Sequence, residues 1–138
     1  MSNIIEVVKA LPQLLPLKAA TLNEITDAEL QLKLTFADEY KEYLSVFGAI
    51  IADGIELSGI AKSEHRNVVT LTMQERVLNP NVPHSMYVLE NARVDGIIIW
   101  QDSKGRVFIS SPNEVPKQIA TSLVEYIKSK EVSERLKK

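Results

Sequence analysis

The sequence has no cysteine among its 138 residues, and it also lacks any long run of apolar side chains. The first absence excludes disulfides, thiolate metal sites and a cysteine nucleophile. The second excludes a membrane-spanning helix, which needs about 18 or more consecutive apolar residues. Near the N-terminus, Pro12 and Pro16 interrupt the uncharged stretch from Ala10 to Leu17, and no basic residue precedes Ile4. The pattern of a signal peptide is thus missing, and we expect a cytoplasmic protein with no membrane partner.

Histidine is nearly as scarce, because the chain has only His65 and His84, both in polar surroundings. Neither has the spacing of a metal site, and no nucleophile elbow or phosphate-binding loop is present. The aspartates Asp53, Asp95 and Asp102 stand beside or near glycine, where they favour turns more than a carboxylate cluster. We therefore expect no enzyme, no metal and no cofactor. A deep pocket lined by His65 or His84 together with Asp95 or Asp102 would favour an enzyme instead.

A strong excess of one charge is also missing, since the formal net charge is −2. Residues 1–59 hold nine carboxylates and four lysines, whereas residues 60–138 hold twelve basic and nine acidic side chains. Acids are interspersed with the bases up to the tail at residues 128–138, so no concentrated basic face is expected. Nucleic acid is therefore not an expected direct partner. What is present is a 45% hydrophobic chain, without repeats or linkers, of a length that buries one core.

The first third of the chain predicts short helices. Residues 4–10 favour a helix, which the prolines at residues 12–16 cannot continue. Thr26 and Glu29 have the spacing of a capping box at a helix start. The apolar positions in residues 28–34 also alternate, however, so this stretch is predicted as either a helix or a strand.

The clearest element is a helix that Thr35 caps and that Gly48 ends. Its apolar positions repeat every three or four residues, and we interpret them as core rather than as a ligand platform. The carboxylates Asp38, Glu39 and Glu42 are then expected on the opposite side, facing solvent. The apolar stripe consists of Phe36, Tyr40, Tyr43, Leu44 and Phe47.

The remainder of the chain predicts an antiparallel sheet followed by a helix. Asp53-Gly54 favours a hairpin between residues 49–52 and 55–57, with positive φ at both central residues. A helix over 68–78 is followed by strands at 86–89, 97–100 and 107–109, and by a helix at 115–127 entered near Pro116. Trp100 and Phe108 are expected in the core, and Gly105 is expected to have positive φ. The fold class is α+β, with helices covering one face of an antiparallel sheet.

Three segments together resemble one protein family. They are the helix FADEYKEYLSVFG at residues 36–48, the strand GIELSG at 54–59, and the paired strands from Tyr87 to Phe108 around DSKG at 102–105. With the closing helix that contains LVEYI at 123–127, their order resembles the SUKH superfamily of Smi/Knr-like immunity proteins over about residues 24–130. The resemblance implies one SUKH-like domain over residues 1–138, in which residues 1–20 are a helical, proline-containing N-terminal extension.

The resemblance also implies a function, namely an immunity protein that binds and neutralises a cognate polymorphic toxin, often a nuclease or deaminase. An acidic surface on this chain would suit the basic cleft of such a toxin. A regulatory adaptor, similar to the fungal branch of the superfamily, is the alternative that the sequence leaves open. A homodimer is expected if the apolar segment 4–17 packs on a neighbouring copy. The candidate contact residues are the carboxylates Glu24, Asp27, Glu29, Asp38, Glu39, Glu42 and Glu56.

Overall fold

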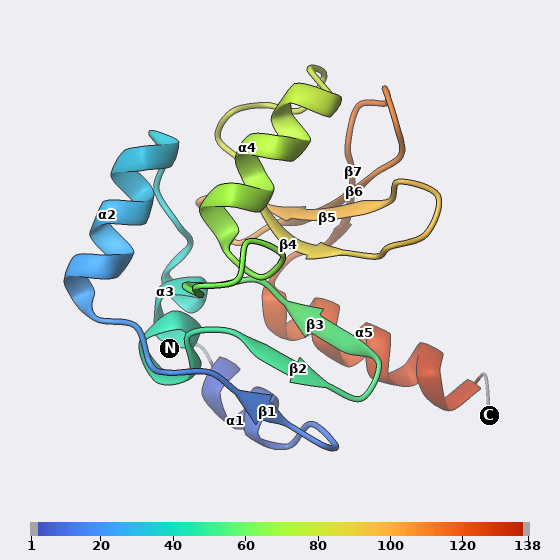
Figure 1. The fold of residues 1–138 in the computed structure, drawn as a ribbon. Helices are drawn as coiled ribbons and strands as arrows, with labels where there is room; N and C mark the ends of the chain where they lie inside the picture. The colour runs from blue at the N-terminus through green and yellow to red at the C-terminus, as the bar shows by residue number, and fades with distance from the viewer. Residues whose placement is uncertain (1–2, 137–138) are drawn as a thin grey trace.

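The computed structural model describes residues 3–136, with side chains described for residues 3–130 (Figure 1). This part of the chain contains five helices and seven strands. The strands form two antiparallel sheets, in the orders β1-β2-β3 and β4-β5-β6-β7. The sheets meet where the backbone N–H of Ser58, just after β3, donates to the carbonyl of Leu89 in β4. The elements are α1 (Ile4–Lys9), β1 (Leu15–Pro16), α2 (Leu22–Leu32), α3 (Asp38–Phe47), β2 (Ile50–Ala52), β3 (Ile55–Leu57), α4 (Val68–Leu78), β4 (Tyr87–Asn91), β5 (Ile98–Gln101), β6 (Val107–Ser110), β7 (Lys117–Ala120) and α5 (Leu123–Leu136).

The expected α+β class with antiparallel sheet and covering helices is confirmed, although the strands divide into two sheets. The predicted apolar stripe of α3 is also confirmed, because all five of its side chains are buried. Its aromatic rings pack edge-on and tilted against each other and against Tyr87. Trp100 is fully buried as predicted, whereas Phe108 is only half-buried. Gly105 has the predicted positive φ, at 89°.

Two expected helix starts are wrong. The capping box is formed by Thr21 and Glu24, not by Thr26 and Glu29. In the stretch 28–34, which the sequence predicted as either a helix or a strand, residues 28–32 belong to the helix α2. The N-cap of α3 is Ala37 rather than Thr35. The reason lies in the connection, where the carboxylate of Glu29 accepts from the Phe36 N–H at 2.8 Å and holds the chain extended before α3.

The expected helix at 115–127 is wrong in its first half. Residues 117–120 form β7, which pairs with β6, and the helix begins only at Leu123. The helical spacing of Val115, Ile119 and Leu123 is accidental, because Val115 and Ile119 are exposed. Pairing with the open edge of β6 satisfies the backbone groups of both strands, and this outweighs the local pattern. In the hairpin turn, Gly54 has a positive φ of 78° but Asp53 does not, contrary to the expectation for both residues.

The N-terminal segment packs on its own chain. Ile4 and Val8 of α1 are completely buried, and α1 contacts α3 and α5. β1 extends the first sheet by pairing with β2 (Figure 1). The apolar face of α1 is thus occupied within the monomer, whereas Leu15 and Leu17 of the same segment are exposed. The homodimer that the sequence suggested stays a prediction. Within residues 3–136, no helix combines the length and the apolar character that crossing a bilayer requires.

Candidate functional site

Two neighbouring hollows of the described surface lie beside α2. One cavity of about 540 Å³ is lined by residues 17–19 and 60–63, by Glu24 and by Arg66. A second, of about 300 Å³, lies between one face of α2 and the start of α4. Glu24 and Ile60 line both cavities, so we treat them as one site and call it the α2–α4 groove. Figure 1 shows α2 and α4 side by side, and the two helices contact each other.

Gly48 and Gly59 allow two backbone segments to approach closely behind the first cavity. The Ile60 N–H donates to the carbonyl of Gly48 at 3.0 Å, and the Leu17 N–H donates to the carbonyl of Ala49 at 2.9 Å. A Cβ at Gly59 would lie 1.7 Å from the Gly48 carbonyl oxygen, which no real side chain tolerates. Glycine therefore lets the segments around residues 17–19 and 60–63 attach to the same short stretch at residues 48–49. These segments are two walls of the cavity.

Both helices of the groove begin with a side-chain cap. The carboxylate of Glu24 accepts from the Thr21 N–H at 2.9 Å, and the Thr21 hydroxyl accepts from the Glu24 N–H at 3.1 Å. The hydrogen bond from the Thr21 backbone, with help from the charge of Lys18, lowers the pKa of Glu24. At α4, Asn67 accepts from the N–H of Val69 at 2.9 Å and donates to the carbonyl of Ala61 at 2.8 Å. Asn67 thus ties one wall of the groove to α4.

The charges of the groove are separated. Lys18, Lys62 and Arg66 surround the larger cavity. Asp27 lines the smaller one, where its carboxylate accepts from the Gln31 amide at 2.6 Å. Glu24 stands where the two cavities meet. The groove therefore has a basic end and an acidic end.

The seven predicted contact carboxylates do not form one surface. Glu24 and Asp27 lie in the groove, whereas Asp38 lines a separate cavity of about 510 Å³ beside the β5–β6 turn and the start of α5. Glu29 is bound to the α2–α3 connection and lies 3.6 Å from Lys41. Two further members lie elsewhere: Glu42 is half-buried on α3, and Glu56 on β3 pairs with Arg93 at 3.5 Å.

The expectation that Glu39 faces solvent is wrong. Glu39 is only 9% exposed, and its Oε1 accepts from the side chain of Gln101 at 2.8 Å and from the backbone N–H of Leu123 at 2.5 Å. Burial raises the pKa of this carboxyl, although the hydrogen bonds from Leu123 and its neighbours oppose the increase. Gln101 also donates to the carbonyl of Gly105 and accepts from the Tyr87 hydroxyl. Glu39 therefore joins α3, the second sheet and α5, and it also lines the cavity that contains Asp38.

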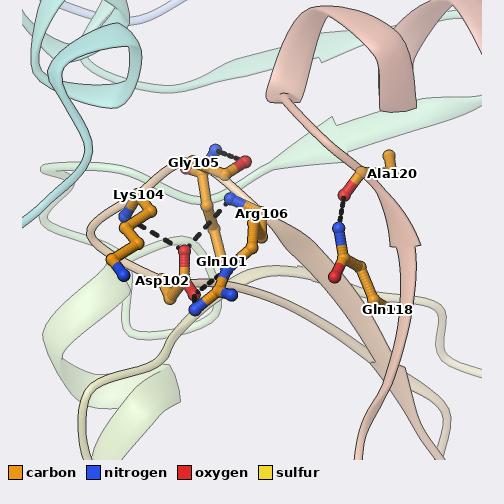
Figure 2. A network of polar contacts seen from close by, with 7 residues as sticks. All are labelled: Gln101, Asp102, Lys104, Gly105, Arg106, Gln118 and Ala120. Atoms are coloured by element: carbon orange, nitrogen blue, oxygen red, sulfur yellow. Dashed lines mark hydrogen bonds and ion pairs between the residues drawn. The ribbon is translucent and has the colours of Figure 1, made fainter.

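The turn after β5 explains one of the glycine-adjacent aspartates. Figure 2 shows the Asp102 carboxylate accepting from the backbone N–H groups of Lys104 and Arg106, both at 3.0 Å. The Arg106 guanidinium adds an ion pair at 2.7 Å. The prediction that Asp102 forms a turn is confirmed.

The cavities described do not join a histidine to Asp95 or Asp102. His65 lines a very small cavity that contains the carboxylates Glu56 and Glu90 instead. Glu90 is buried and accepts from the Tyr126 hydroxyl at 2.5 Å and from Lys130 at 2.6 Å, an arrangement that no local sequence pattern indicates. Among the residues with described side chains, no three histidines or carboxylates lie close enough together to hold a metal ion.

Comparison with known families decides the relationship. A SUKH family model, described as SMI1-KNR4 cell-wall, matches residues 1–132. The chain belongs to the SUKH superfamily. The match includes residues 1–20, which we expected to be an N-terminal extension. The structure gives the reason, because α1 packs on α3 and α5 and β1 pairs with β2 in the first sheet. A search of curated proteins found no match.

Sequence reasoning missed the basic end of the groove. Lys18, Lys62 and Arg66 are separated along the chain, and only the backbone contacts at Gly48 and Gly59 bring their segments together. A weak signal was available in the polar interval at residues 62–67, because connecting loops on rigid scaffolds carry function more often than the elements they join.

Proposed function

We propose that this SUKH domain is a cytoplasmic immunity protein that binds and neutralises a cognate polymorphic toxin, a nuclease or deaminase, by protein–protein contact. The observation that carries the proposal is the α2–α4 groove, whose walls offer apolar and charged side chains on two capped helices. A protein–protein interface combines apolar side chains with a polar rim, and the groove offers side chains of both kinds.

The acidic end of the groove supports contact with a basic cleft. Asp27 is exposed, and the lowered pKa of Glu24 beside it further favours the charged form of that carboxyl. Carboxylates in this position would attract the basic residues with which nucleic-acid-cleaving domains hold their substrate. Charge complementarity of this kind speeds association and selects the partner more than it adds affinity.

Apolar surface continues from the groove along α4. Val69 lines the groove, and Met73 and Val77 follow it at intervals of four residues, on the same face of the helix. Met73 is 44% exposed and Val77 is 82% exposed. Exposed apolar side chains at the rim of a charged groove are typical of a surface that a partner covers.

The test is a growth assay in which the chain is co-expressed with the toxin domain encoded beside it. In this assay the wild-type protein should restore growth, and Asp27→Lys should weaken the protection. In a binding measurement with the same toxin domain, Asp27→Lys should lower the association rate by at least about tenfold. Glu114→Lys is the matched control, because it reverses the same charge on the exposed β6–β7 connection at a residue that lines neither cavity of the groove. A folded wild-type protein that neither binds the toxin domain nor protects the cells would refute the proposal.

A second candidate is a regulatory binding module that controls a host protein. It is favoured by the description of the matched family, which names the cell wall. The same assay separates the two candidates. An adaptor would bind a non-toxic host protein through the groove and would leave toxin-treated cells unprotected.

A further inference from the structure

We propose that the basic end of the α2–α4 groove binds a segment of the partner protein that presents a carboxylate beside an apolar side chain. This inference rests on the proposed function and names the chemistry of the contact. It assigns a role to Lys18, Lys62 and Arg66, the residues that line the larger cavity and carry positive charge.

Positive charge is in excess at this end, because three cations line it with one carboxylate, Glu24, on which the charge of Lys18 acts. Among the residues with described side chains, the ion pairs join Lys41 to Glu29, Arg93 to Glu56, Arg106 to Asp102 and Lys130 to Glu90. None of these pairs includes a cation of the larger cavity. Glu24 is the one carboxylate among the residues that line it, and its oxygen already accepts from the Thr21 N–H.

Arg66 gives the strongest indication of a ligand. Its Nε and Nη2 atoms are buried, and neither has a hydrogen-bond partner within the described residues. A buried donor without an acceptor is costly, and for a charged group the cost is larger. A guanidinium is shaped to donate two parallel hydrogen bonds to one carboxylate. Arg66 lines the larger cavity of the groove and also the very small cavity that contains Glu56 and Glu90. A partner carboxylate in the larger cavity would relieve this cost if the guanidinium turns towards it.

The walls of the cavity add an apolar requirement. Leu17 is 37% exposed, and Ile60 and Ala61 are partly exposed beside it. The volume of about 540 Å³ lies in the range of sites that enclose small ligands, which is ample for two neighbouring side chains. A carboxylate at the lysines and Arg66 and an apolar group against Leu17 and Ile60 would fill it together.

The two ends of the groove then give the partner segment a direction. An acidic residue would lie at Arg66 and a basic residue at Asp27, with Glu24 and Ile60 between them. The reversed segment would place like charges together at both ends, which disfavours it. This arrangement is compatible with a toxin cleft that is basic as a whole but carries one acidic residue at its edge.

The first experiment uses 3-phenylpropionate as a probe, with 3-phenylpropanamide as the uncharged control of the same shape. In NMR titrations, the carboxylate should shift the Arg66 Nε–H and the amides of residues 61–63 at concentrations at least about tenfold lower than the amide does. Arg66→Gln should abolish this preference. The variant should fold, because the Arg66 Nε and Nη2 atoms form no hydrogen bond that it would remove. Equal shifts from both probes, or shifts confined to other surfaces, would overturn the inference.

The second experiment places the same variant, together with Lys62→Glu, in the toxin assay. We expect toxin binding to weaken by at least about tenfold in each variant, while circular dichroism shows an unchanged fold. If the wild type protects cells and both variants protect equally well, the basic end is not the contact, although the proposed function stands. If the wild type does not protect cells, the proposed function fails, and the probe titration still decides whether this end binds carboxylates.

Discussion

Glu39 offers the sharpest test of how the fold is held together. Its Oε1 alone accepts both the Gln101 side-chain N–H at 2.8 Å and the Leu123 backbone N–H at 2.5 Å. Glu39→Ala removes this acceptor and leaves two donors without partners at buried positions. Glu39→Gln keeps one oxygen that can accept both bonds, removes the charge and replaces the second oxygen with an NH2 group.

The expected magnitudes follow from this difference. Each buried donor left without a partner costs about 1–3 kcal/mol, so Glu39→Ala should lower the free energy of unfolding by about 2–6 kcal/mol. Glu39→Gln loses the strength of charged hydrogen bonds but avoids the burial of a charge, and we expect a net change of about 1 kcal/mol or less. The two variants should therefore differ clearly, although they alter the same side chain.

The pH dependence gives an independent check. Burial raises the pKa of Glu39 above its ordinary value of 4.5, so the folded protein binds this proton more tightly than the unfolded chain does. Wild-type protein should therefore gain stability relative to Glu39→Gln as the pH falls from above the folded pKa towards 4.5. This direction is opposite to that of a carboxylate whose pKa is lowered by folding.

Urea unfolding of the three proteins, followed by tryptophan fluorescence of Trp100 at a series of pH values, measures all these quantities. Equal destabilisation by alanine and glutamine would show that charge, not the acceptor, is what the core requires. An unchanged stability of Glu39→Ala would refute the hydrogen-bond arrangement itself.

Three further substitutions test other parts of the structure. Gly59→Ala should lower the stability by at least about 3 kcal/mol, since its Cβ would lie 1.7 Å from the Gly48 carbonyl oxygen, and an unchanged Tm would contradict the close approach. Trp100→Ala should cost about 3–5 kcal/mol in urea unfolding because the side chain is fully buried, and a cost typical of a surface residue would place it outside the core. Tyr126→Phe should cost about 1.5–3 kcal/mol because its hydroxyl donates to Glu90 at 2.5 Å, and a variant as stable as the wild type would show that this bond adds nothing.

The sequence was sufficient to predict a helix or strand where the pattern of that element's own residues determines its structure. The α3 stripe could be predicted because its buried positions repeat with helical spacing, and the helix over 68–78 matches α4 (Val68–Leu78). β7 could not be predicted, because its reason for forming is the open edge of β6 rather than its own residues. Glu39 was misplaced for a related reason: its partners, Gln101 and Leu123, are far from it in the sequence.

The site was less predictable than the fold. Charge arithmetic identified an acidic N-terminal half, and two of its carboxylates, Glu24 and Asp27, do lie in the groove. It could not predict that Glu29 accepts a hydrogen bond from the Phe36 N–H just before α3, or that Glu39 accepts one from the Leu123 N–H at the start of α5. The basic end of the groove depends on segments that meet only in three dimensions.

The most direct test of the central claim is hydrogen exchange of the chain in complex with the toxin domain that the proposed function assigns to it. If the α2–α4 groove is the contact surface, the amides of residues 24–31 and 60–67 should exchange more slowly in the complex, while those of residues 111–116 should not change. Protection confined to the second sheet or to the connection at 111–116, with residues 60–67 unaffected, would contradict the account.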